Sequence, residues 1–144
     1  MSRSGYSDDL DQRDLAMWRG QVASTIRSKR GQAFLKELAA AMDAMPVKEL
    51  IRGELVNEDG DCCTIGVVCK TRGIDVSEVD YEDPETVGKA VGIARQMAAE
   101  IEWQNDENDR PKFVKRPDGG HDRFEETPAE CWQRMRKWVE ANIK

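Results

Sequence analysis

Two stretches in the first third of the chain carry apolar residues at every third or fourth position. Such spacing places these side chains on one face of a helix. We therefore predict a helix over residues 11–27 and a second over residues 32–45. Gly31 is suited to end the first and Pro46 the second, and the short connection favours antiparallel packing. The apolar positions are Leu15, Trp18, Val22 and Ile26, then Leu35, Leu38, Met42 and Met45.

The middle of the chain shows shorter patterns. Residues 54–63 predict a small β-hairpin, because Asp59 and Gly60 at its centre tolerate the positive φ angles of a tight turn. Residues 64–69 form a short apolar run, and periodicity leaves both a strand and a buried turn of helix open at this length.

A pair of helices is predicted next. Asp83 is a suitable N-cap, and Pro84 fits the first helical position. Gly92 interrupts the apolar pattern, which then resumes and continues to Gln104. The pattern therefore predicts two helices joined by a short turn.

The segment 105–126 is polar and rich in turn-forming residues. Either a small hairpin between Phe113 and Phe124 or an irregular loop fits it. We expect this segment to be dispensable for folding, because a polar loop offers little to a core.

The last helix has the clearest signal. Thr127, Pro128 and Glu130 form a capping box with proline at the first helical position. We expect this helix to belong to the core, with its tryptophans packed in the apolar stripe and their edges free to be exposed. The whole pattern predicts a mainly α fold of about five helices in one domain over residues 1–144. The apolar stripe is Trp132, Met135, Val139 and Ile143, widened by Cys131 and Trp138.

Composition changes the picture mainly through charge. The formal net charge is −6, which disfavours nucleic acid and anionic lipid and makes a protein the expected partner. No apolar run approaches the roughly 18 residues of a membrane span, and the N-terminus lacks the apolar core of a signal peptide. We therefore expect a cytoplasmic protein with reduced cysteines. The oligomeric state stays open.

Charge is also unevenly spread. Residues 53–110 carry five basic and fifteen acidic side chains. A run of six carboxylates within this segment is either an acidic face for a basic protein partner or a solvated loop with helix-start carboxylates. The six residues are Asp75, Glu78, Asp80, Glu82, Asp83 and Glu85.

Residues 86–101 also resemble the pattern of a helix-turn-helix, with Gly92 in the turn. A nucleic-acid-binding regulator would use the second helix to read bases. The acidic surroundings provide few phosphate contacts, so a packed helical hairpin is the favoured reading. The nucleic-acid contacts in the alternative are Arg27, Lys29, Arg30, Lys89, Arg95 and Gln96.

No motif points to catalysis or to a cofactor. The four cysteines lack the paired spacing of a structural zinc site, and His121 is the sole histidine. The chain has no phosphate-binding loop, no dinucleotide fingerprint and no nucleophile elbow. We therefore expect a non-enzymatic protein without metal or cofactor.

Across most of its length the chain resembles a group of small bacteriophage and prophage proteins of unknown activity. The similarity includes no catalytic signature. It implies a phage-type accessory protein expressed in a bacterial host cell. By analogy, such proteins bind and block host proteins, including CRISPR and other defence machinery. The stretches that carry the resemblance are residues 6–9, 27–32, 60–66, 72–75, 105–107 and 126–128, with Arg134, Met135, Trp138 and Val139.

Overall fold

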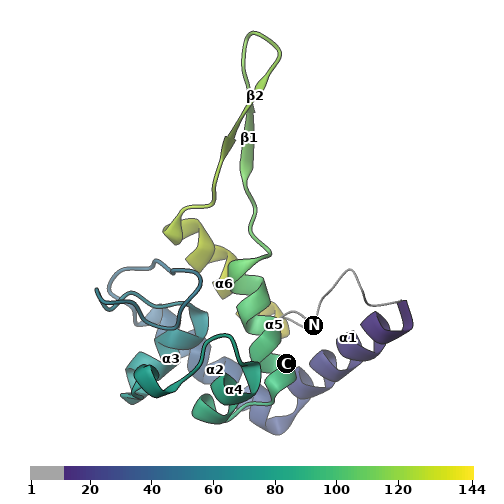
Figure 1. The fold of residues 1–144 in the computed structure, drawn as a ribbon, viewed down its shortest axis with the longest axis vertical. Helices are drawn as coiled ribbons and strands as arrows, with labels where there is room; N and C mark the ends of the chain where they lie inside the picture. Colours follow the sequence, from purple (N-terminus) through teal and green to yellow (C-terminus); the bar gives the residue numbers. More distant parts are fainter. Residues whose placement is uncertain (1–11) are drawn as a thin grey trace.

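The computed structural model describes residues 12–144. In this part the chain forms six α-helices and one two-stranded antiparallel hairpin, which confirms the predicted mainly α fold. The helices pack into one body, from which the hairpin projects (Figure 1). None of the helices in residues 12–144 is long and apolar enough to cross a membrane. Residues 6–9, which carry part of the resemblance, lie outside the described residues.

The first two helices meet at Ser28. Helix α1 (Gln12–Arg27) buries Trp18, Val22 and Ile26, and helix α2 (Lys29–Asp43) follows directly. The Ser28 hydroxyl accepts a hydrogen bond from the Gly31 backbone N–H and caps α2. Gly31 therefore lies inside α2 instead of ending α1. A Cβ atom there would lie 2.1 Å from the Thr25 carbonyl oxygen, so the two helices approach too closely for a side chain.

Residues 64–69 are helical, which settles the alternative left open by the sequence. Helix α3 (Thr64–Arg72) begins at Cys63, whose thiol accepts from the Gly66 N–H, and buries its whole first half. The preceding segment, expected to be a hairpin, forms only one antiparallel bridge, between Val56 and Cys62. The Asn57 side chain explains this, because its oxygen accepts from two backbone N–H groups and closes a tight loop beyond the bridge.

Helix α5 runs through the centre of the body. A short 3-10 helix η1 (Val76–Glu78) leads to helix α4 (Pro84–Val91), which begins at the predicted Asp83 N-cap. Gly92, with a φ of 82°, turns the chain into α5 (Arg95–Asp106). This helix packs against α1, α3, α4 and α6. Its buried residues are Met97, Ala98, Ala99, Glu100, Ile101, Glu102 and Asn105.

Helix α6 (Pro128–Asn142) starts at the predicted capping box, with both hydrogen bonds present. Its buried residues are Cys131, Met135 and Val139, which recur every four positions. Trp132 and Trp138 flank this line and are only half-buried against the core. Both tryptophans thus pack against the core with exposed edges, because a four-residue stripe leaves positions one step away at its margin.

We expect Met135→Ala to lower the free energy of unfolding by about 2–5 kcal/mol, since Met135 is fully buried and its removal leaves a cavity. Trp132→Ala should cost less, because part of the Trp132 side chain remains in water. Urea unfolding followed by circular dichroism measures both. A larger loss in the tryptophan variant would show that the core of α6 is centred elsewhere.

Candidate functional site

The hairpin forms an arm that buries none of its strand residues. Strands β1 (Lys112–Lys115) and β2 (His121–Phe124) are exposed at every position. The side chains of Phe113, Val114 and Phe124 are 64%, 52% and 52% exposed. They are three of the five large apolar side chains exposed in residues 12–144. A lone two-stranded ribbon is only marginally stable in water. It has no core in which these apolar side chains could be buried.

The arm has two different faces. In the observed register Phe113 lies opposite Arg123, and Lys115 lies opposite His121. Alternation along a strand places these four on one face, which carries no carboxylate from the strands. The other face carries Lys112 opposite Phe124 and Val114 opposite Asp122. Each face therefore combines exposed apolar and charged side chains.

The edges of the arm are protected against pairing with another strand. Both strands have only four residues, and β1 lies between Pro111 and Pro117, which have no N–H to donate. Short strands, prolines and charged side chains are the usual means of blocking edge-to-edge pairing. The side-chain faces, and not the backbone edges, are thus the surfaces available for binding.

The base of the arm is fixed by a nearly buried carboxylate. The side chain of Glu126 is 3% exposed and accepts from Arg134 Nε at 2.7 Å and from Arg52 Nη2 at 2.7 Å. Arg134 also donates to the carbonyl oxygens of Gln104 and Asn105 at the end of α5. Burial raises the pKa of Glu126, but the two guanidinium groups outweigh it and lower the pKa overall. The arm therefore leaves the body from a rigid point.

A second contact holds β1 against the start of α6. Lys112 Nζ lies 2.5 Å from Glu130 Oε2. The ammonium group of Lys112 and the capping hydrogen bonds with Thr127 lower the pKa of Glu130 to about 2. The carboxylate that caps α6 thus also positions the first residue of the arm.

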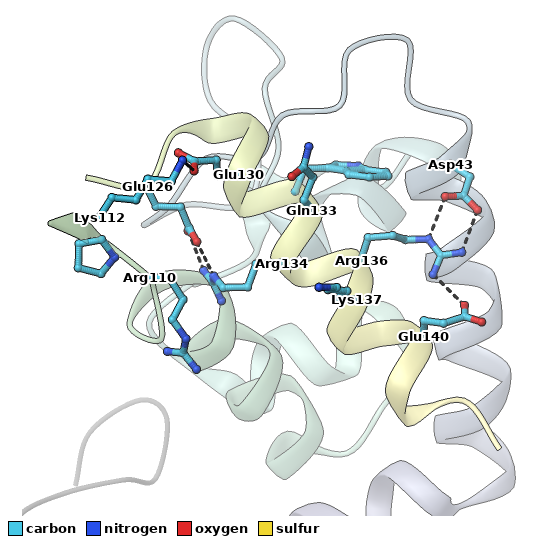
Figure 2. A pocket seen from close by; sticks show the side chains of 12 residues that line it. Asp43, Arg110, Lys112, Glu126, Glu130, Gln133, Arg134, Arg136, Lys137 and Glu140 are labelled. Atoms are coloured by element: carbon cyan, nitrogen blue, oxygen red, sulfur yellow. Dashed lines mark hydrogen bonds and ion pairs between the residues drawn. The ribbon is translucent and has the colours of Figure 1, made fainter. Parts of the chain in front are cut away.

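An open groove of about 1020 Å³ lies beside the base of the arm (Figure 2). We call it the α6 groove. One side is the exposed face of α6, and the other is the chain entering and leaving the arm. Arg136 reaches from α6 toward α2 (Figure 2), donating to Asp43 at 2.9 and 3.0 Å and to Glu140 at 3.0 Å. The lining residues are Asp43, Arg110, Pro111, Lys112, Glu126, Glu130, Trp132, Gln133, Arg134, Arg136, Lys137 and Glu140.

The cysteines are poorly suited to nucleophilic chemistry. All four are buried and free of disulfides. Burial raises the pKa of Cys63 well above its usual value and that of Cys69 to about 11. A protonated thiol is a weak nucleophile. No group of three or more histidine, cysteine, aspartate or glutamate side chains in residues 12–144 is arranged to hold a metal ion.

The acidic segment is exposed, but half of its carboxylates form local caps. Asp75 accepts from the N–H and hydroxyl of Ser77, and Asp83 accepts from the Glu85 N–H and the Thr86 hydroxyl. These hydrogen bonds lower the pKa of Asp75 and Asp83. Asp80 accepts in the same way from the Glu82 N–H. The structure therefore favours the interpretation that these carboxylates serve turns and helix starts. Glu78, Glu82 and Glu85 are exposed beside them.

The residues of the nucleic-acid alternative fall at two helix junctions. Arg27, Lys29 and Arg30 are exposed where α1 meets α2. Lys89 ends α4, and Arg95 and Gln96 begin α5. Beyond this first turn α5 is buried from Met97 to Glu102 and at Asn105, and it packs against four other helices. A recognition helix needs a free face along its length to enter a DNA groove, and α5 does not offer one.

No protein-family model matches the chain, and the searches found no similar curated protein and no similar solved structure. The arm and the α6 groove therefore have to be interpreted from their own geometry.

The sequence did not identify these two features as a site. The available signal was a pair of phenylalanines placed among lysines and arginines on either side of a proline–glycine turn.

We expect Phe113→Ala and Phe124→Ala each to change the free energy of unfolding by less than about 0.5 kcal/mol, as for exposed positions generally. Chemical denaturation checks this. A loss above about 2 kcal/mol would mean that the arm packs on the body and is not a free surface.

Proposed function

We propose that this protein is a non-catalytic binding protein that holds a protein partner against its arm. The observation that carries the proposal is the exposure of Phe113, Val114 and Phe124 on a ribbon anchored at its base by Glu126. Val114 and Phe124 lie on one face of the ribbon and Phe113 on the other, so each face offers a partner an exposed large apolar side chain. A rigid base limits the conformational freedom that the arm loses on binding.

Charge supports a protein over a nucleic acid as the partner. Most cations on the arm already have a nearby carboxylate: Arg116 lies 3.2 Å from Asp122, and Arg123 lies 3.3 Å from Glu125. Binding to nucleic acid draws much of its affinity from several phosphate contacts. An arm with few uncommitted cations on a chain of net charge −6 is better suited to a protein surface.

The biological setting follows from the resemblance to small phage and prophage proteins. We place the protein in the cytoplasm of a bacterial host cell, as a phage-type accessory protein. The partner is a host protein or protein complex, and a component of a defence system such as CRISPR is the class that the analogy favours.

An affinity pull-down from nuclease-treated bacterial lysate tests the proposal. The comparison is between the unaltered chain and the double variant Phe113→Ser, Phe124→Ser. The matched control is Met17→Ser, Val47→Ser, which removes the other two large apolar side chains that are exposed within residues 12–144. We expect a protein that the control retains and the arm variant loses. Equal recovery with both variants, or retention of nucleic acid only when nuclease is omitted, would refute the proposal.

A further inference from the structure

The α6 groove contains more cations than its own carboxylates can match. Each carboxylate that lines it already has a basic partner. Asp43 and Glu140 accept from Arg136, Glu126 accepts from Arg134, and Glu130 contacts Lys112.

Two basic side chains of the groove have no such partner. Among the described residues no carboxylate lies within ion-pair distance of Arg110 or Lys137. Both side chains are exposed, and the hydrogen bonds that Arg110 donates go to the carbonyl and amide oxygens of Asn108 and to the Asp109 carbonyl oxygen. Arg110 comes from the chain that leads into the arm, and Lys137 comes from α6, so the two stand on different elements. Arg110 and Lys137 therefore give the groove positive charge that the carboxylates lining it do not neutralise.

The remaining surface of the groove is suited to a peptide. Pro111 and the half-buried Trp132 contribute apolar walls, and Gln133 offers an amide that both donates and accepts. The guanidinium groups of Arg134 and Arg136 are committed to Glu126 and Asp43, so no cluster of free donors is present to surround a phosphate. Two cations on separate elements, with apolar surface near them, fit single carboxylates spaced along an extended chain.

We propose that the α6 groove binds an acidic segment of the partner protein, with carboxylates pairing to Arg110 and Lys137 and apolar side chains lying on Trp132 and Pro111. The inference rests on the proposed function, because it places a second contact beside the arm. The arm supplies apolar contact, and the groove adds selection for an acidic sequence.

Fluorescence anisotropy with a labelled synthetic peptide tests the inference. The probe alternates glutamate and leucine, and its control replaces every glutamate by glutamine. We expect the chain to bind the glutamate peptide, to lose affinity as salt is raised, and to bind the glutamine peptide about tenfold more weakly or not at all. Arg110→Glu and Lys137→Glu should each reduce affinity by about tenfold. Lys89→Glu, which changes an exposed cation on α4, should leave affinity unchanged.

The inference would be overturned by the absence of binding, by equal binding of both peptides, or by indifference to the Arg110 and Lys137 variants. Tighter binding of a single-stranded oligonucleotide at the same ionic strength would also overturn it. Thermal melting of each variant confirms that the exposed substitutions leave the fold intact. The two proposals can be distinguished. If the arm substitutions abolish recovery of the partner but the chain does not bind the glutamate peptide, the arm proposal stands and the groove proposal fails.

Discussion

Gly66→Ala is expected to destabilise the protein strongly, because Gly66 of α3 lies directly against the backbone of Leu55. A Cβ atom at Gly66 would lie 1.8 Å from the carbonyl oxygen of Leu55 and 2.7 Å from its carbonyl carbon. Both atoms belong to the backbone, so no side chain can rotate away. The Cys63 N–H donates to the same Leu55 oxygen at 3.0 Å, which ties the start of α3 to this segment. We expect a loss of at least about 3 kcal/mol in the free energy of unfolding.

Gly20→Ala is the matched control. Gly20 lies inside α1, and an added Cβ there would meet nothing within 4 Å. Alanine should stabilise the helix by about 0.5–1 kcal/mol, because glycine has the poorer helix propensity. Urea unfolding followed by circular dichroism compares the two variants. If Gly66→Ala unfolds at the same urea concentration as the unaltered chain, the close approach of α3 to Leu55 is absent in solution.

Glu126→Ala is also expected to destabilise the protein strongly. The substitution leaves Arg134, whose side chain is 15% exposed, and the more exposed Arg52 without their shared carboxylate. Removing one partner of a buried ion pair typically costs about 3–5 kcal/mol, and the partial exposure of Arg52 places this case near about 3 kcal/mol. Asp122→Ala removes the carboxylate from an exposed pair with Arg116 and should cost less than about 1 kcal/mol.

The same carboxylate predicts a dependence of stability on pH. The pKa of Glu126 is lower in the folded chain than the usual value of 4.5, so its stabilising contribution is present above pH 4.5 and is lost as the pH falls through the folded pKa. The variant Glu126→Gln should therefore lose less stability than the unaltered chain on acidification below pH 4.5. Urea midpoints at neutral and acidic pH measure this. Parallel losses in both proteins would mean that other carboxylates account for the whole acid response.

Local signals in the sequence predicted the elements whose ends depend on neighbouring residues. The Thr127–Glu130 capping box, the Asp83 N-cap and the turn at Gly92 all occur where the pattern placed them. Features that depend on contacts between distant residues were not predicted. Gly31 was predicted to end a helix. It instead allows a close approach to the Thr25 carbonyl oxygen, which depends on how two helices pack against each other.

The candidate site was harder to predict than the fold. The anchor at the base of the arm joins Glu126 to Arg52, 74 residues away, and no local pattern indicates such a pair. The hairpin between Phe113 and Phe124 was one of two alternatives, and its projection from the body depends on packing that spacing does not describe. The hairpin predicted over residues 54–63 was wrong for a local reason. Backbone N–H groups donate to the Asn57 side chain, and these hydrogen bonds replace the expected strand pairing.

Several residues outside the arm fix the helices at its base. Thr64 donates to Asn105 Oδ1 at 2.7 Å and joins α3 to α5. Asp106 accepts from the Tyr81 hydroxyl at 2.6 Å, and Arg134 fixes Glu126. Residues 105–107 and 126–128 lie immediately before and after the segment that contains the arm. These contacts belong to the scaffold, and the arm is where we propose binding.

The most direct test of the binding proposal is site-specific photo-crosslinking in living bacteria. A photoreactive amino acid replaces Phe113 on the arm or, as the control, Val47, which is 58% exposed on the body. The account predicts a discrete protein adduct from position 113 that is absent from position 47. An equal adduct from both positions, an adduct to nucleic acid from position 113, or no adduct from the arm would contradict it.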